Sequence, residues 1–134
     1  MLSIFITLTA LFITGCKPKP KIHGNIVGKW RIIKSEFECP TVRQESQLNS
    51  ISTVNDKLVL KFSDAGVETF YPEALRPPVP YKLEGDTLII HYPGETPPYI
   101  SRSYIEFLTA DKLLMREPKK EVNCILVSTF KRIP

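Results

Sequence analysis

The sequence predicts an all-β fold in which eight short antiparallel strands form an up-and-down meander and close into a small barrel. Apolar and polar residues alternate along most of the chain with the period of two that is typical of half-buried strands. Turn-forming residues recur between these runs, and a helical period is almost absent. Residues 16–134 are enough for one domain with a single core.

The first three expected strands are residues 28–37, 57–63 and 67–71. The first of them carries the lone tryptophan of the chain. The second places leucines and a phenylalanine on one face, and its two lysines on the other. The turn at residues 64–66 contains aspartate and glycine, which favours a hairpin between the second and third strands.

Five more strands follow, separated by two proline-rich loops at residues 72–80 and 93–98. Proline cannot donate to a strand ladder, so these loops mark strand ends. The turn 84–86 again predicts a hairpin. The five expected strands are residues 81–83, 87–92, 99–108, 112–117 and 122–132.

Short connections favour antiparallel pairing of neighbours, and eight such strands can close and remove both sheet edges. The one long connection is residues 38–56, whose polar middle, residues 42–50, predicts a short helix over one mouth of the barrel.

The register of the first and last strands tests closure. Along an antiparallel pair, the residue numbers of directly opposed residues add up to a constant. Trp30 opposite Arg132 sums to 162, and Cys39 with Cys124 sums to 163, so one register nearly satisfies both pairs. A bulge or Pro40 would absorb the difference. We therefore expect an Arg132–Trp30 cation–π contact at the closed end. We also expect a Cys39–Cys124 disulfide, with two buried thiols as the alternative.

The first sixteen residues predict export. The uncharged apolar run 2–13 is shorter than the ~20 residues that a membrane-spanning helix needs, which is typical of a signal peptide. The motif Ile13-Thr14-Gly15-Cys16 resembles the lipobox of bacterial lipoproteins, and this resemblance implies that Cys16 is acylated, with palmitate among its lipids. The alternative is an ordinary secretory signal that leaves Cys16 as a free thiol.

The residue after Cys16 is Lys17 and not Asp, which in such lipoproteins implies the outer membrane, facing the periplasm. We accordingly divide the chain into a signal peptide at 1–15, a lipidated Lys/Pro tether at 16–26 and a barrel domain at 27–134.

The body of the chain resembles a known family. Gly28-Lys29-Trp30 opens the first strand, a turn-rich meander follows, and Phe130-Lys131-Arg132 ends the last strand. This pattern is similar to the small lipocalin-like lipoprotein domains of bacteria. The resemblance implies a barrel that binds a small apolar or amphipathic ligand.

Composition and motifs exclude several functions. The formal net charge is +4, and three positive charges lie in residues 17–21, so no clustered basic face indicates nucleic-acid binding. No nucleophile elbow or phosphate-binding loop is visible. His23 and His91 lack the spacing of metal ligands. We expect no enzyme activity, cofactor or metal.

Two functions remain open for a chain that we expect to be a monomer. In the first, the barrel interior binds a ligand past a rim of aromatic and basic residues; if large apolar side chains fill the interior instead, nothing binds there. In the second, the proline and tyrosine loops bind a periplasmic protein, as in an assembly accessory, inhibitor or immunity protein, with Arg76, Arg102 and Arg116 as anchors. The rim candidates for either function are Tyr71, Arg76, Tyr81, His91, Tyr92 and Tyr99.

Overall fold

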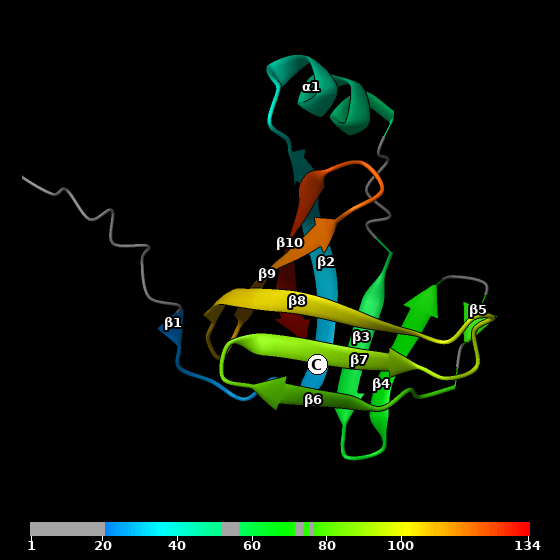
Figure 1. The fold of residues 1–134 in the computed structure, drawn as a ribbon. Coiled ribbons are helices and arrows are strands. Elements are labelled where there is room, and N and C mark those ends of the chain that lie inside the picture. Colours follow the sequence, from blue (N-terminus) through cyan, green and yellow to red (C-terminus); the bar gives the residue numbers. More distant parts are fainter. Residues whose placement is uncertain (1–20, 52–56, 72–73, 76) are drawn as a thin grey trace, which may run out of the picture.

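A computed structural model describes residues 21–51, 57–71, 74–75 and 77–134, which form a nearly closed, barrel-shaped sheet and one helix (Figure 1). The strand order is β5-β4-β3-β2-β10-β9-β8-β7-β6, and β1 pairs with β8. The sheet coils so that β6, β7 and β8 cross β2, β3 and β4 (Figure 1). The elements are β1 (Lys21–Ile22), β2 (Gly28–Glu38), α1 (Val42–Ile51), β3 (Val59–Ser63), β4 (Gly66–Tyr71), β5 (Ala74–Leu75), β6 (Tyr81–Glu84), β7 (Thr87–Tyr92), β8 (Tyr99–Leu108), β9 (Lys112–Lys119) and β10 (Cys124–Ile133).

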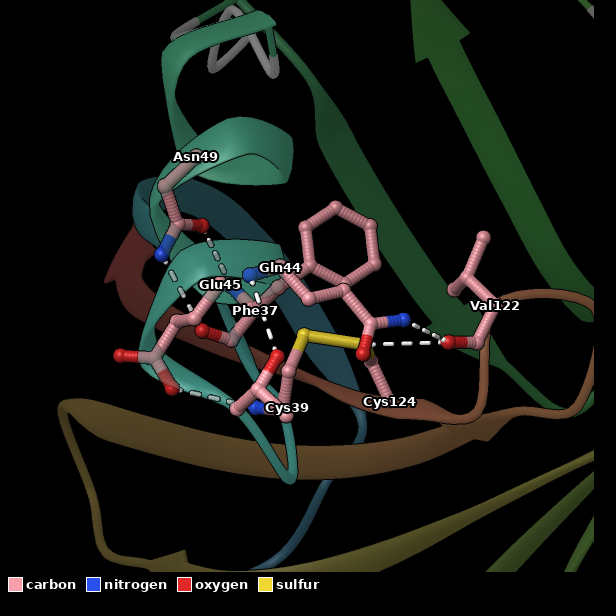
Figure 2. The surroundings of a disulfide bond; sticks show 8 residues. Phe37, Cys39, Gln44, Glu45, Asn49, Val122 and Cys124 are labelled. Atoms are coloured by element: carbon pink, nitrogen blue, oxygen red, sulfur yellow. Dashed lines mark hydrogen bonds between the residues drawn. A yellow bond between two sulfur atoms is a disulfide. The ribbon is translucent and has the colours of Figure 1, made fainter.

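The eight predicted strands are all present, as β2–β4 and β6–β10, and the all-β prediction is confirmed. The two-residue strands β1 and β5 were not expected. The predicted helix forms as α1, because Thr41 caps it by accepting a hydrogen bond from the backbone N–H of Gln44 at 3.3 Å. This helix lies beyond the end of β2, where the Asn49 side chain accepts from the Phe37 N–H at 2.7 Å (Figures 1 and 2).

The first and last long strands are neighbours, as closure requires. Arg132 lies opposite Trp30, as predicted, and its guanidinium sits 4.2 Å from the centre of the indole ring. The register shifts by one residue between Thr129 and Phe130, so Ile33 is the extra residue of a bulge in β2. Pro40 is therefore not needed to absorb the difference.

Arg132 also holds together segments that are distant in sequence. Its guanidinium donates to the backbone carbonyls of Asn25, Val27 (2.6 Å) and Ala110. Gly28 makes room for it: φ is +133° there, and an added Cβ would lie 2.3 Å from Arg132 Nη1. The Gly-x-Trp triplet thus has a physical reason, because glycine admits the guanidinium that covers the tryptophan.

A second contact between distant parts of the sheet joins β4 to the segment before β6. Val67 and Val79 exchange two backbone hydrogen bonds of 2.9 and 3.0 Å. Gly66 permits this approach, since a Cβ there would lie 2.5 Å from the Val79 carbonyl oxygen. The barrel is thus closed along β2–β10 and joined by a short bridge on the other side.

The predicted disulfide links Cys39 with Cys124, whose Cα atoms are 4.5 Å apart, at the end of β2 away from Trp30 (Figure 2). Glu45 of α1 accepts from the Cys39 N–H at 3.1 Å, and Gln44 donates to the Val122 carbonyl. The disulfide and α1 together fasten the β9–β10 turn to β2.

Residues 21–26 belong to the folded domain, although the sequence analysis assigned them to the tether. The His23 N–H donates to the Leu108 carbonyl at 2.8 Å, and Ile26 is buried. The Ile26 carbonyl accepts from the Trp30 indole N–H at 2.7 Å. The folded part therefore begins no later than Lys21, and the segment 21–27 covers the closed end of the barrel, around which the largest fully buried side chains gather: Trp30, Phe62, Leu88, Ile105, Leu108 and Leu113.

We predict that Arg132→Ala lowers the free energy of unfolding by about 3 kcal/mol, because three charge-assisted hydrogen bonds and a cation–π contact are lost together. Arg132→Lys keeps the charge but loses the forked donors of the guanidinium, so its stability should lie between those of wild type and Arg132→Ala. Urea denaturation measures these values. The matched control is Lys131→Ala, an exposed neighbour on the same strand, which should change stability by less than about 0.5 kcal/mol. Equal effects at the two positions would contradict this role of Arg132.

We predict that the paired substitution Cys39→Ser with Cys124→Ser lowers stability by about 4 kcal/mol, because the disulfide spans 85 residues and restricts the unfolded chain. Intact mass checks the bond directly. Alkylation of the unreduced, unfolded protein should leave both cysteines unmodified, and alkylation after reduction should label both. Labelling of both without a reductant would show that the bond is absent.

Candidate functional site

The barrel encloses a cavity of about 250 Å³ that is open at one end. Register decides which side chains reach it: Trp30 faces inward, so its partners Leu60 and Arg132 do too. Every second residue along each strand follows, except across the register shifts in β2 and β8. The inner wall is apolar on one part of its surface, which is formed by Leu60, Val67, Ile90, Met115 and Phe130.

The remainder of the cavity wall is polar. Two charged residues, Glu117 and Lys119, project from β9. Six residues contribute hydroxyl groups: Thr69, Tyr92, Tyr99, Ser101, Ser103 and Ser128. A wall of this kind suits a ligand that has both apolar and hydrogen-bonding surface.

The two charged residues form an ion pair at the level of Ser101. Lys119 Nζ lies 2.7 Å from Glu117 Oε1, and the Ser101 hydroxyl donates to the same oxygen at 3.3 Å. About a third of each charged side chain is exposed, so the pair is only partly shielded from solvent. Within the described residues, Oε2 of Glu117 accepts no hydrogen bond. The pair can therefore offer both an acceptor and a donor to a bound molecule.

An outer chamber of about 360 Å³ adjoins the cavity and shares Val67, Thr69, Tyr92 and Tyr99 with it. The rings of Tyr92 and Tyr99 stack at 4.6 Å between centroids and 19° between planes. These tyrosines line both chambers where they meet, and Pro77 and Gly94 extend the outer chamber into the two proline-rich loops.

β8 and β9 separate beside the inner cavity. Their pairing ends at Tyr104 and Arg116, so residues 99–103 and 117–119 have no ladder between them. Pro118, which has no N–H to donate, lies in this stretch of β9, where its ladder partner is Ile125 of β10. No residue of α1 is among those that line either chamber, so the helix lies beside the disulfide and not over this opening.

Two large aromatic residues lie on the outer wall of the barrel. A register shift between Ile105 and Phe107 turns the Phe107 ring outward, where Lys112 Nζ lies 5.6 Å from the ring centre. Phe70 is opposed to Val59, on the face of β3 and β4 away from the core. These two rings therefore do not fill the interior of the barrel.

Other rim candidates lie elsewhere. Tyr81 packs edge-on against Phe62 with ring centroids 5.1 Å apart, in the core wall, and burial together with the charge of Asp64 raises the pKa of its phenol. His91 alternates with the inward residues of β7, so it faces outward and lines neither chamber. Arg76, Cys16 and the side chain of Tyr71 lie outside the described part of the chain.

The arginines proposed as partner anchors differ in availability. Arg102 is exposed. Arg116 is held on the outer wall by ion pairs with Glu38 and Glu106, and hydrogen bonds to these carboxylates, to Glu38 most of all, raise the pKa of its guanidinium further above the ordinary value. It spans β10 above buried Val127, its neighbour in the ladder, and so joins three strands.

The inward polar residues were not predicted from the sequence: Ser101, Ser103, Glu117, Lys119 and Ser128. The period of two could have indicated the two charged residues, because Leu113 and Met115 are followed at the same spacing by Glu117 and Lys119.

In the described ranges, no three His, Cys, Asp or Glu side chains are grouped as metal ligands, and no helix has the length and apolar character to span a bilayer. Comparison with protein-family models, curated proteins and solved structures gave no significant match.

Proposed function

We propose that this chain is a lipid-anchored periplasmic protein of the bacterial outer membrane that binds a small amphipathic ligand inside a lipocalin-like barrel. The observation that carries the proposal is the cavity of about 250 Å³, which continues at its open end into a chamber of about 360 Å³. Ligand sites are concave, largely preformed pockets of ~300–1,000 Å³, and the two chambers together fall in this range.

The closed end and the opening lie at opposite ends of β8. Tyr99 is at the opening, whereas Phe107 pairs with Lys21 of β1. These levels are about 26 Å apart along the strand, and five residues from Cys16 to Lys21 reach at most about 18 Å. A lipidated Cys16 would therefore stay within about 18 Å of the closed end and could not reach the level of Tyr99.

A second candidate function is protein binding, and one observation favours it. Tyr99, Ile100 and Tyr104 are each about half exposed (51, 45 and 50%) on β8, at and beyond the end of its pairing with β9. They border a groove of about 470 Å³ that also includes Arg102. Tyrosine and arginine are enriched at interface centres.

We predict that native mass spectrometry of the protein recovered from its own membrane shows a non-covalent small-molecule adduct. Ser128→Phe should remove this adduct, because the larger side chain occupies the cavity that Ser128 lines. The control is Thr129→Phe, which places the same ring on the outer face of the same strand. An adduct that persists in Ser128→Phe, or a wild-type spectrum with only a protein partner, would contradict ligand binding inside the barrel.

We also predict that Cys16→Ala releases the protein from the membrane fraction, because the acylated cysteine is the expected anchor. Detergent-phase partitioning measures this. Cys39→Ser should stay in the detergent phase. Partitioning of Cys16→Ala into detergent would overturn the lipid anchor.

A further inference from the structure

We infer that the ligand of the barrel is uncharged and carries several hydroxyl groups, as a glycoside does, and that it is not a simple fatty acid or hydrocarbon. This inference rests on the proposed ligand-binding function. It follows from three features of the cavity wall: its charge balance, a buried hydroxyl without a partner, and an apolar surface combined with tyrosines.

The charge balance favours a neutral ligand. Glu117 and Lys119 are the only charged residues that line the inner cavity within the described ranges, and they neutralise each other at 2.7 Å. A carboxylate ligand would compete with Glu117 for Lys119, and an ammonium ligand would compete with Lys119 for Glu117. Either would leave one charge without its partner in a partly shielded site. A hydroxyl group can donate to one residue and accept from the other without separating them.

The Ser103 hydroxyl favours a ligand with a polar atom deep in the cavity. Ser103 is only 5% exposed, yet its hydroxyl has no hydrogen-bond partner in the described residues. No side-chain oxygen there is both fully enclosed and unpaired, so the Ser103 hydroxyl reaches the cavity that it lines. A hydrocarbon chain would desolvate this group without replacing its hydrogen bond with water.

The polar groups lie at two depths. Ser103 is two residues further along β8 than Ser101, which places the two inward hydroxyls about 7 Å apart. The ion pair lies at the level of Ser101, because Glu117 accepts from it. A ligand with one polar head can satisfy only one level. A ligand with hydroxyls distributed over its length can satisfy both.

The rest of the wall fits the apolar face of such a molecule. Ile90, Met115 and Phe130 offer apolar surface beside the hydroxyls, and the stacked Tyr92 and Tyr99 stand at the opening. The inner volume of about 250 Å³ accommodates about eight groups the size of a water molecule, which is close to one sugar ring. An apolar group attached to the ring would extend into the outer chamber.

Isothermal titration calorimetry of the purified full-length protein with four probes that share an octyl chain tests the inference. The probes are octyl β-glucoside, 1-octanol, octanoate and octylammonium, each used below its micellar concentration. We expect the glucoside to bind at least ~10-fold more tightly than each of the others, since only it supplies neutral hydroxyls at both depths. Backbone amide shifts around Ser101 and Ser103 on titration would place the glucoside in the cavity.

Three variants test which residues cause the preference for the glucoside. Ser103→Ala should weaken the glucoside about 5-fold and leave octanol unchanged. Glu117→Gln leaves Lys119 without its carboxylate and should shift the preference toward octanoate. The matched control is Glu68→Gln, which breaks a similar pair with Lys61 on the outer wall, 3.4 Å long, and should change no affinity.

Octanol or octanoate binding as tightly as the glucoside would overturn the inference and leave the proposed function standing. Equal glucoside affinity in Ser103→Ala and wild type would also overturn it. If none of the probes binds, the glycoside class is wrong, and the small-molecule adduct in the native mass spectrum decides separately whether the barrel binds a ligand at all.

Discussion

The contact on which the rest of the structure depends is that of the Arg132 guanidinium with the face of Trp30. It lies where the first and last long strands meet, so it fixes their register, and it also draws the backbone at Asn25, Val27 and Ala110 onto the closed end. A buried indole with its N–H satisfied by Ile26 needs this cover, since the strands alone would leave the end of the barrel open.

Closure at this end allows the other end to open. The β2–β10 seam, the bridge at Val67 and the disulfide each constrain part of the wall, whereas β8 and β9 stop pairing after Tyr104 and Arg116. Inward side chains change from apolar to polar along the same direction, from Leu113 to Glu117. The closed core and the candidate site thus occupy different ends of one small barrel, and polar groups that would be costly in the core are kept near solvent.

Much of this fold could be predicted from the sequence, because its strands follow a period of two and their ends contain glycine or proline. The closure register followed from two pairs of residues whose numbers nearly share a sum. The bulge at Ile33 could not be placed, since a one-residue shift has no marker in composition. The packing of residues 21–26 was missed because Ile26 is the one buried residue of 22–26, so the segment shows no alternation of apolar and polar residues.

The candidate site was harder to predict. Along residues 99–103 both faces of the strand are mixed, with Ile100 exposed and Ser103 buried, so alternation alone does not say which face is inward. The outward positions of Phe70 and Phe107 follow from register, which depends on partner strands and not on local sequence. Tyr92 and Tyr99 were found because each borders a proline-rich loop, where a strand ends.

Proton NMR tests the central pairing most directly. The account predicts nuclear Overhauser contacts between the Arg132 side chain and the Trp30 ring, with upfield ring-current shifts of the Arg132 δ protons, and cross-strand contacts that change register once, at Ile33. Unshifted Arg132 protons together with the absence of contacts between β2 and β10 would contradict a barrel closed by its own first and last strands.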